Sequence, residues 1–350
     1  MTYRILILGA SYGSLLGTKL LMAGHDVTLV CRSETAKLIN AEGTEVRIKL
    51  KGEDTHRSFR SADMPGHLTA LAPEDVDPSE YDLVGLAMQE PQYGAQSIWQ
   101  LMRRIAVARV PCLSIMNMPP LPYLKRISGL HTANLEASYT NPRVWDGFDP
   151  DLVTLCSPDP QAFRPPEEKP NVLHVGLPTN FKAAEFGRPE ATDMLRKLET
   201  DISAIRWDGS DVPVKLRVSE SLFVPLAKWS MLLTGNYRCI TSTEPRSIRD
   251  AVHSDPDASG GVYAYVDGLA QHLGAAPEDL VPYEKYARAA EHLLKPSSAA
   301  RAVAAGATRI ERVDKLVQLI GQDIGYVNAA VEDTVRTVDM TLERNQMKAA

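Results

Sequence analysis

The first residues whose types and spacing indicate a function are glycines near the start of the chain. Gly9 and Gly13 follow the apolar run Arg4–Leu8, with Ser11 where the usual G-x-G-x-x-G pattern has its second glycine. A strand, a tight turn and a helix in this order expose backbone N–H groups and the positive helix end to a pyrophosphate. The alternative is a plain crossover that binds no nucleotide. The predicted cofactor-binding residues of this turn are Gly9, Ser11, Tyr12 and Gly13.

The next predicted strand, Val27–Val30, leads to an arginine rather than an acid. An acidic side chain after Cys31 would hydrogen-bond the ribose 2′-hydroxyl of NAD, whereas Arg32 suits the 2′-phosphate of NADP. A solvated surface arginine is the alternative interpretation. We therefore expect NADP as the cofactor, bound in part by Arg32.

A second group of candidate residues lies in the last third of the chain. Lys228 occurs in an otherwise apolar stretch, and Asn236 follows eight residues later on the same predicted helix face. A buried lysine has a lowered pKa, which suits a general acid, although a lysine can also extend its amine to the surface. The segment Pro296-Ser297-Ser298 is typical of a helix N-cap. Glu311 follows, and by itself it could equally be a surface carboxylate.

Alternating strands and helices are predicted to position the first group. Predicted strands at Tyr81–Met88 and Pro111–Asn117 flank an amphipathic helix over 93–107, a pattern typical of a parallel, doubly wound sheet. Ligands bind at the carboxyl ends of such strands, where Gln89 and Asn117 lie. Ordinary loop amides are the alternative for both. A further strand is predicted at Glu45–Lys51.

The remaining chain divides into a mixed and a helical part. We expect further strands over 131–156, a surface loop over 157–170 and an edge strand at Ile205–Trp207. Helical patterns follow, including a run over Leu216–Tyr237 that Pro225 should break, and another over Glu311–Ala330. The predicted fold is α/β, with an N-terminal Rossmann-type NADP-binding domain at 1–210 and an all-helical substrate and dimerisation domain at 211–350.

Composition excludes several classes of protein. The 350 residues carry a net charge of −6, which argues against a nucleic-acid binder held by phosphate contacts. No apolar run approaches the roughly 20 residues of a membrane span, and a first strand expected from residue 3 leaves no room for a signal peptide. Four scattered cysteines indicate a reducing cytoplasm and no metal site.

The order and separation of these residues resemble the ketopantoate reductase (2-dehydropantoate 2-reductase) family. That family has an N-terminal glycine turn, an arginine after the second strand, an Asn closing a later strand, and a helical domain with a catalytic lysine. The corresponding positions are Gly9, Gly13, Arg32, Asn117, Lys228, Asn236, Ser297, Ser298 and Glu311.

The resemblance implies an NADPH-dependent reductase whose substrate is a 2-oxo acid. This substrate would bind between the two expected domains. Hydride would reach the carbonyl carbon while Lys228 protonates the oxygen, and Glu311 would bond a substrate hydroxyl or orient Lys228. Implied substrate-binding residues are Asn236, Ser297, Ser298 and Asn117; Gln89, Asn117 and Glu311 are implied on the cofactor side. A homodimer is also expected.

Three residues depart from the family pattern. Gln89 stands where the family has a lysine, Met118 where it has a glycine, and Leu232 where it has a second asparagine after the catalytic lysine. Two alternatives therefore stay open: an opine- or imine-type dehydrogenase acting on a C=N bond, and a degenerate NADP-binding protein without catalysis.

Overall fold

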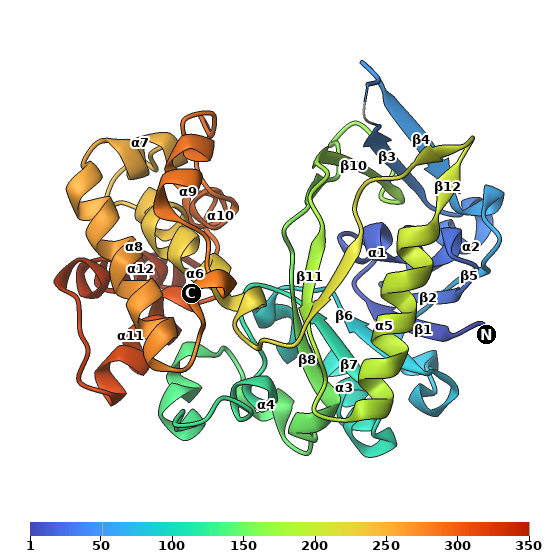
Figure 1. The fold of residues 1–350 in the computed structure, drawn as a ribbon, viewed down its shortest axis with the longest axis horizontal. Coiled ribbons are helices and arrows are strands. Elements are labelled where there is room, and N and C mark those ends of the chain that lie inside the picture. Colours follow the sequence, from blue (N-terminus) through green and yellow to red (C-terminus); the bar gives the residue numbers. More distant parts are fainter. Residues whose placement is uncertain (51, 350) are drawn as a thin grey trace. The chain divides into compact units, whose positions relative to one another are not determined.

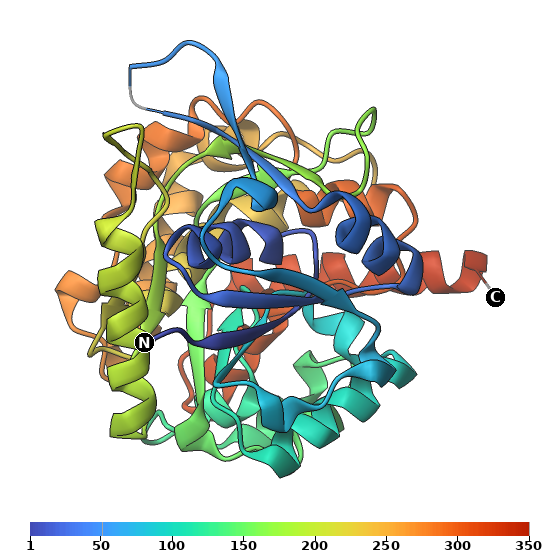
Figure 2. The same cartoon turned by 90° about the vertical axis from the view of Figure 1, so that its right-hand side faces the viewer.

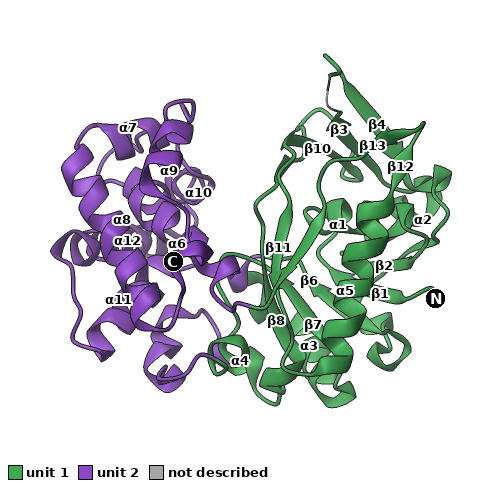
Figure 3. Ribbon diagram, in the orientation of Figure 1, with its two compact units in different colours: residues 1–88, 92–126, 143–220 green, residues 89–91, 127–142, 221–350 purple. Residues whose placement is uncertain are grey.

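The computed structural model describes residues 1–50 and 52–349, which form two compact units. Unit 1 comprises residues 1–88, 92–126 and 143–220, and unit 2 comprises 89–91, 127–142 and 221–350 (Figure 3). The change from sheet to helices thus falls after residue 220 instead of 210, because β14 (Leu216–Ser219) is still a strand of the sheet.

An eight-stranded sheet forms the centre of unit 1 (Figure 1). Its order is β14-β11-β8-β7-β6-β1-β2-β5, and every neighbouring pair is parallel except β11 with β8. The expected doubly wound α/β sheet is confirmed. Besides β14, its strands are β1 (Arg4–Leu8), β2 (Asp26–Val30), β5 (Leu68–Leu71), β6 (Leu83–Leu86), β7 (Cys112–Ile115), β8 (Val153–Ser157) and β11 (Phe181–Ala184).

Helices cover both faces of this sheet because its central strands are apolar on both sides. In Figure 2 the dark-blue helix α1 lies above β1 and β2, and the cyan segment around residue 100 lies below them. Ile5 through Leu8 of β1 have no solvent exposure, as expected of a strand buried on two faces. The helices of unit 1 are α1 (Gly13–Met22), α2 (Ser33–Glu42), α3 (Gln96–Ala108), α4 (Leu121–Leu124) and α5 (Pro189–Ala204).

Two expectations for the middle of the chain were wrong. Of the strands expected over 131–156, only β8 forms, and the rest is a series of short 3-10 turns around buried apolar side chains. The loop expected over 157–170 contains β9 (Gln161–Phe163), which pairs antiparallel with β10 (Val172–Leu177). These two strands complete a second sheet of order β4-β3-β10-β9, with β3 at Glu45–Lys49 and β4 at His56–Arg60.

The remaining small strands also differ from expectation. Lys51, the last residue of the predicted strand at 45–51, lies outside the described residues. The expected edge strand at Ile205–Trp207 instead forms a separate hairpin of β12 (Arg206–Trp207) and β13 (Ser210–Asp211). The edge position of the large sheet belongs to β14, which pairs in parallel with β11.

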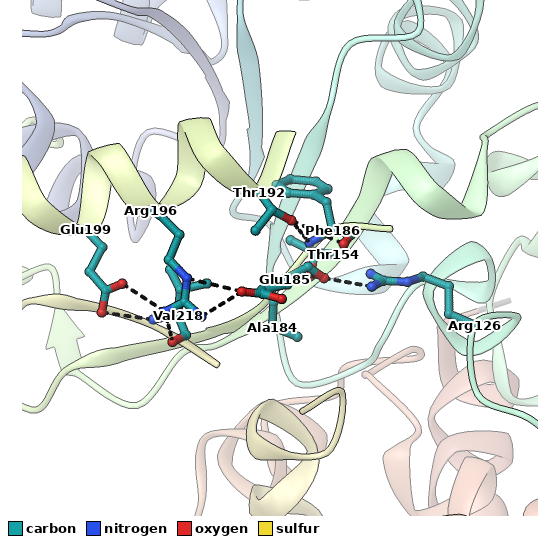
Figure 4. Close-up of polar contacts among 9 residues, drawn as sticks. All are labelled: Arg126, Thr154, Ala184, Glu185, Phe186, Thr192, Arg196, Glu199 and Val218. Carbon is teal, nitrogen blue, oxygen red and sulfur yellow. Dashed lines mark hydrogen bonds and ion pairs between the residues drawn. The ribbon is translucent and has the colours of Figure 1, made fainter. Parts of the chain in front are cut away.

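A polar network connects the end of β11 to α5, β8 and β14 (Figure 4). The guanidinium of Arg196 on α5 donates to the Glu185 carboxylate at 2.7 Å and to the Val218 carbonyl at 2.7 Å. Arg126 donates to the Glu185 carbonyl at 2.8 Å, and the Thr154 hydroxyl donates to the Ala184 carbonyl at 2.7 Å. Carbonyls that the sheet ladder leaves without a strand partner are therefore satisfied by side chains.

Unit 2 is helical. Its elements are η8 (Val224–Ala227), α6 (Lys228–Met231), the π-helix η9 (Leu232–Asn236), α7 (Ile248–His253), α8 (Pro256–His272), α9 (Tyr283–Ala290), α10 (Ser298–Ala304), α11 (Val313–Asp323) and α12 (Ala329–Ala349). The helical run expected over 216–237 was wrong for residues 216–219, which form β14. The break expected near Pro225 is observed, since the helical part begins with η8 at Val224 and then passes through α and π geometry. The helix expected over 311–330 ends at Asp323. No helix in the described part of the chain has the length and apolar character to cross a membrane.

Candidate nucleotide and substrate sites

The turn between β1 and α1 has the close packing that a phosphate-binding turn needs. Gly9 has φ +107°, and a Cβ there would lie 2.7 Å from the Ala87 carbonyl oxygen. A Cβ on Gly13 would lie 2.5 Å from a methyl carbon of Ile7, so only glycine lets α1 begin this close to β1. A Cβ at Gly17 would make ordinary contacts of 3.4 Å or more. The first two glycines therefore set the turn.

Tyr12 fixes this turn to another part of unit 1. Its hydroxyl donates to the Pro160 carbonyl at 2.6 Å, and its ring packs edge-on against Phe181 at a centroid distance of 5.9 Å. Burial, and secondarily the Cys156 and Asp159 side chains, raise the pKa of the Tyr12 phenol, so it remains a donor. Ser11 is exposed in the turn. The β8–β9 connection therefore lies beside the glycine turn, which sequence patterns did not indicate.

Arg32 lies where the sequence places it, directly after β2, and its side chain is exposed. It is the N-cap residue of α2 but gives no side-chain cap, and among the described residues it forms no ion pair or hydrogen bond. Cys31 beside it is partly buried, and burial raises the pKa of its thiol to about 11. An arginine without a protein partner at this strand end fits an anionic ligand.

The two amides expected at strand ends fall in different units. Asn117 follows β7 in unit 1 and is half-buried. Gln89 follows β6, is exposed, and belongs to the 89–91 segment of unit 2.

In unit 2, Lys228 is the first residue of α6 and is partly exposed. The π-helix η9 follows directly and ends at Asn236. The distortion is explained by a contact with α9. The Tyr286 hydroxyl donates to the Met231 carbonyl at 3.1 Å, which places a side chain where the backbone hydrogen bonds of the helix would continue. A Cβ on Gly235 would lie 1.9 Å from that hydroxyl, so glycine is required there. Single π turns of this kind are frequent at functional sites.

Hydrogen bonds bring the later candidates to the end of η9. The buried hydroxyl of Ser297 donates to the Asn236 carbonyl at 2.8 Å and accepts from the Ala300 N–H at 3.1 Å, so it caps α10 as predicted. The Tyr237 hydroxyl donates to the Glu311 carbonyl at 2.6 Å and accepts from the Val313 N–H at 3.0 Å. Ser297 therefore contacts the Asn236 backbone, and the buried side chain of Tyr237, the next residue, contacts the backbone that carries Glu311.

Ser298 differs from Ser297 in its exposure to solvent. It is the first residue of α10, and its side chain is exposed. Since the Ser297 hydroxyl is already used for the cap, Ser298 is the serine of this pair that solvent reaches. The order of the two serines thus separates a structural from an accessible hydroxyl.

Sequence reasoning missed Glu90, which lies beside Glu311. The Glu90 N–H donates to Oε1 of Glu311 at 3.3 Å, and the Glu90 carboxylate accepts from the Thr140 N–H at 2.9 Å. Glu90 is 3% exposed, and burial raises the pKa of its carboxyl. The only feature of the sequence that could have indicated Glu90 was its position next to Gln89, after the strand β6. Glu90 positions the Glu311 side chain through its backbone.

A buried ion pair holds the backbone that carries Glu311. The Arg312 guanidinium contacts both oxygens of Asp314 at 2.9 Å, and Asp314 is fully buried. Arg312 also binds Asp339 of α12, which Lys315 contacts at 3.1 Å. Removing one partner from such a buried pair leaves an uncompensated charge. The start of α11 is therefore rigidly connected to α12.

Known proteins share sequence features and the fold of this chain. The family model of ketopantoate reductase PanE/ApbA matches residues 5–96. No curated protein matches the sequence. The solved structure of 2-dehydropantoate 2-reductase from Methylococcus capsulatus is similar, with 13% identity, a TM-score of 0.66 and coverage of 98% of this chain and 97% of that chain.

Two further solved structures have the same fold. The PanE/ApbA family ketopantoate reductase from Ralstonia eutropha is 16% identical, with a TM-score of 0.61 over 98% of this chain and 99% of that one. D-mandelate dehydrogenase in complex with NADH is 13% identical, with a TM-score of 0.61 over 97% and 99%. The resemblance expected from the sequence is thereby confirmed: residues 5–96 match the ketopantoate reductase PanE/ApbA family, and nearly the whole chain has the fold of ketopantoate reductases.

Proposed function

We propose that this protein is an NADPH-dependent reductase that transfers hydride to the carbonyl carbon of a 2-oxo acid. The observation that carries the proposal is the set of contacts at the end of η9 in unit 2, where Ser297 bonds the Asn236 backbone and Tyr237 bonds the Glu311 backbone. Lys228 lies on the same helical segment as Asn236. A cation, an amide and a carboxylate of this kind can bind and polarise a small oxo acid.

The residues of unit 1 fit a dinucleotide. Gly9 and Gly13 leave room for close approach to the start of α1, and Arg32 offers an exposed guanidinium at the end of β2 that pairs with no other described residue. The bound cofactor would supply the hydride. We assign Gly9, Ser11, Tyr12, Gly13 and Arg32 to its binding, with Gln89, Asn117 and Glu311 as further contacts.

We assign the chemical step to residues of unit 2. Lys228 donates a proton to the substrate oxygen, and Asn236 and Ser298 bind polar groups of the substrate. Glu311 bonds a substrate hydroxyl or orients Lys228, and Glu90 holds the Glu311 carboxylate through its N–H. Ser297 acts through the Asn236 backbone because its hydroxyl is used for capping.

The function is tested by following NADPH oxidation with a panel of 2-oxo acids, each with and without an amine. Turnover of at least one oxo acid without amine is expected. A requirement for amine would instead indicate an imine-reducing enzyme. NADPH binding with no turnover on any member of the panel would indicate a binding protein and contradict the proposal.

Arg32→Ala is expected to weaken NADPH binding about tenfold to a hundredfold while NADH binding changes little. A charge-assisted contact to the 2′-phosphate contributes about 1.5–3 kcal/mol, and NADH lacks that phosphate. Fluorescence titration of both cofactors measures the effect. Since D-mandelate dehydrogenase of the same fold binds NADH, equal affinity of the wild type for the two cofactors would refute the assignment.

We further propose a homodimer formed through unit 2. Large apolar side chains are exposed there, including Leu294, Val327, Met340 and Met347, each more than 60% exposed. Multi-angle light scattering at micromolar concentration is expected to give twice the chain mass, and a monomer mass would exclude the dimer. None of the four cysteines forms a disulfide within the described part of the chain, in keeping with the proposed cytoplasmic location.

A further inference from the structure

The helical segment that carries Lys228 and Asn236 leaves few of its side chains accessible. Of residues 225–237 in unit 2, only Lys228, Met231 and Asn236 are partly exposed, and all the others are buried. Successive residues of a regular α-helix lie about 100° apart around its axis, so these three positions would spread over about 140°. Leu232 would then lie inside that arc, yet it is buried. A regular helix therefore does not account for the burial pattern.

The π-helix η9 between Lys228 and Asn236 changes the angle between them. The Tyr237 N–H bonds the Leu232 carbonyl, five residues back instead of four. Because such a turn accommodates one residue more than an α turn, Asn236 has about the rotation of a seventh residue after Lys228. The angle between these two residues falls from about 80° to about 20°. The three partly exposed positions then lie within about 60°, in agreement with their burial.

Tyr286 and Gly235 are the residues that produce this π turn. The Tyr286 hydroxyl donates at 3.1 Å to the Met231 carbonyl, which in a regular helix would accept from the N–H of residue 235. A Cβ on Gly235 would lie 1.9 Å from the hydroxyl, so the contact requires glycine. Tyr286 is buried in α9, stacked on Tyr263 at a centroid distance of 5.8 Å. Burial also raises the pKa of the Tyr286 phenol, which keeps it a donor.

We propose that Tyr286 and Gly235 are positioning residues of the active site, because their π turn brings Lys228 and Asn236 onto one helix face. This inference rests on the proposed function, in which Lys228 protonates the substrate oxygen and Asn236 binds another polar group of the same molecule. The two residues are separated by about two turns, roughly 11 Å along the axis, so both reach one small oxo acid only from the same side. Tyr286 and Gly235 act through the helix and do not contact the substrate.

Tyr286→Phe is expected to lower kcat/KM about tenfold to a hundredfold for an oxo acid that the wild type reduces, because a displacement of about 1 Å can have an effect of this size. The Kd for NADPH should stay nearly unchanged. Adding Tyr286→Phe to Asn236→Ala should cause little further loss, since Tyr286 acts through Asn236. Tyr265→Phe is the matched control, because the buried Tyr265 hydroxyl donates to the Tyr326 carbonyl at 2.8 Å in the same unit. This variant should keep the wild-type kcat/KM.

A double variant separates positioning from stability. Gly235→Ala alone should lower the melting temperature, because the added methyl group collides with the Tyr286 hydroxyl. Combining it with Tyr286→Phe removes the collision and favours a regular α-helix, so the melting temperature should recover while kcat/KM stays low. The crystal structure of this double variant is expected to show Asn236 rotated by about 100° relative to Lys228.

Three results would overturn the positioning role of Tyr286 and Gly235. They are a wild-type kcat/KM in Tyr286→Phe, recovery of activity together with stability in the double variant, and a π-helix retained in its crystal structure. A wild-type protein that reduces no oxo acid would instead overturn the proposed function. The crystal structure of the double variant would then still show whether Tyr286 and Gly235 produce the π turn.

Discussion

Lys228→Ala is expected to lower kcat by about 10²–10⁴-fold on any oxo acid that the wild type reduces, while the Kd for NADPH stays nearly unchanged. Hydride addition builds negative charge on the carbonyl oxygen, so a nearby ammonium stabilises the transition state more than the ground state. General-acid catalysis typically contributes a factor of this size. Stopped-flow or steady-state assays of NADPH oxidation measure kcat, and fluorescence titration measures the Kd.

Two further variants distinguish a proton donor from a structural lysine. Lys228→Arg keeps the positive charge but should stay inactive, because a guanidinium does not give up its proton near neutral pH. Lys285→Ala removes an exposed lysine of α9 in the same unit and should retain full kcat. Near-normal kcat in Lys228→Ala would refute the assignment, and the donor would then be sought first near Gln89 and Asn117.

The stability of the protein is expected to rise with pH between about 7 and 10.5 because of Lys19. This lysine of α1 is fully buried, and its ammonium donates to the carbonyls of Pro213 at 3.0 Å and Val212 at 3.4 Å. Burial, reinforced by the charge of Lys215 and opposed by Asp211, lowers the pKa of Lys19 from 10.5 to about 7.

The sign follows from proton counting. Between these two pKa values the unfolded chain keeps the proton of Lys19 and the folded chain loses it, so raising the pH favours the folded state. At 1.36 kcal/mol per pKa unit, the free energy of unfolding increases by about 5 kcal/mol in total. None of this increase is present below about pH 7, and all of it is present above about pH 10.5.

Lys19→Met isolates this contribution because methionine keeps an unbranched stem without the charge. Urea unfolding between pH 7.5 and 9.5 should show the wild type gaining about 1.4 kcal/mol per pH unit relative to the variant. Lys37→Met, at an exposed position of α2, should run parallel to the wild type. A difference between wild type and Lys19→Met that does not change with pH would contradict the lowered pKa.

The sequence by itself determined the elements whose signals are local. The apolar run that Gly9 interrupts predicted β1 and the glycine turn. The helical spacing of apolar residues after Gly9 predicted α1, and similar apolar runs predicted the other buried strands of the sheet. The N-cap at Ser297 was recognised for the same reason, since its hydroxyl bonds an N–H only three residues away. Such interactions lie within one or two turns and leave a pattern in neighbouring residues.

Tertiary contacts decided what no local pattern carries. The run over 216–237 reads as a helix, yet Tyr286, 55 residues away, inserts its hydroxyl at Met231 and makes a π-helix of the stretch before Asn236. The strands expected over 131–156 fail because the apolar residues there are buried individually in 3-10 turns. Neither outcome is encoded by periodicity, because the partner lies elsewhere in the chain.

The same holds for charge. In the sequence, no local pattern distinguishes Lys19 from a lysine at the surface of a helix. The structure buries Lys19 under residues 212–213, whose carbonyls accept hydrogen bonds from its ammonium. Whether a charged side chain is solvated depends on what the fold places over it, 193 residues away for Lys19. The sequence thus determined which groups the protein has, and the tertiary structure decided which of them water can reach.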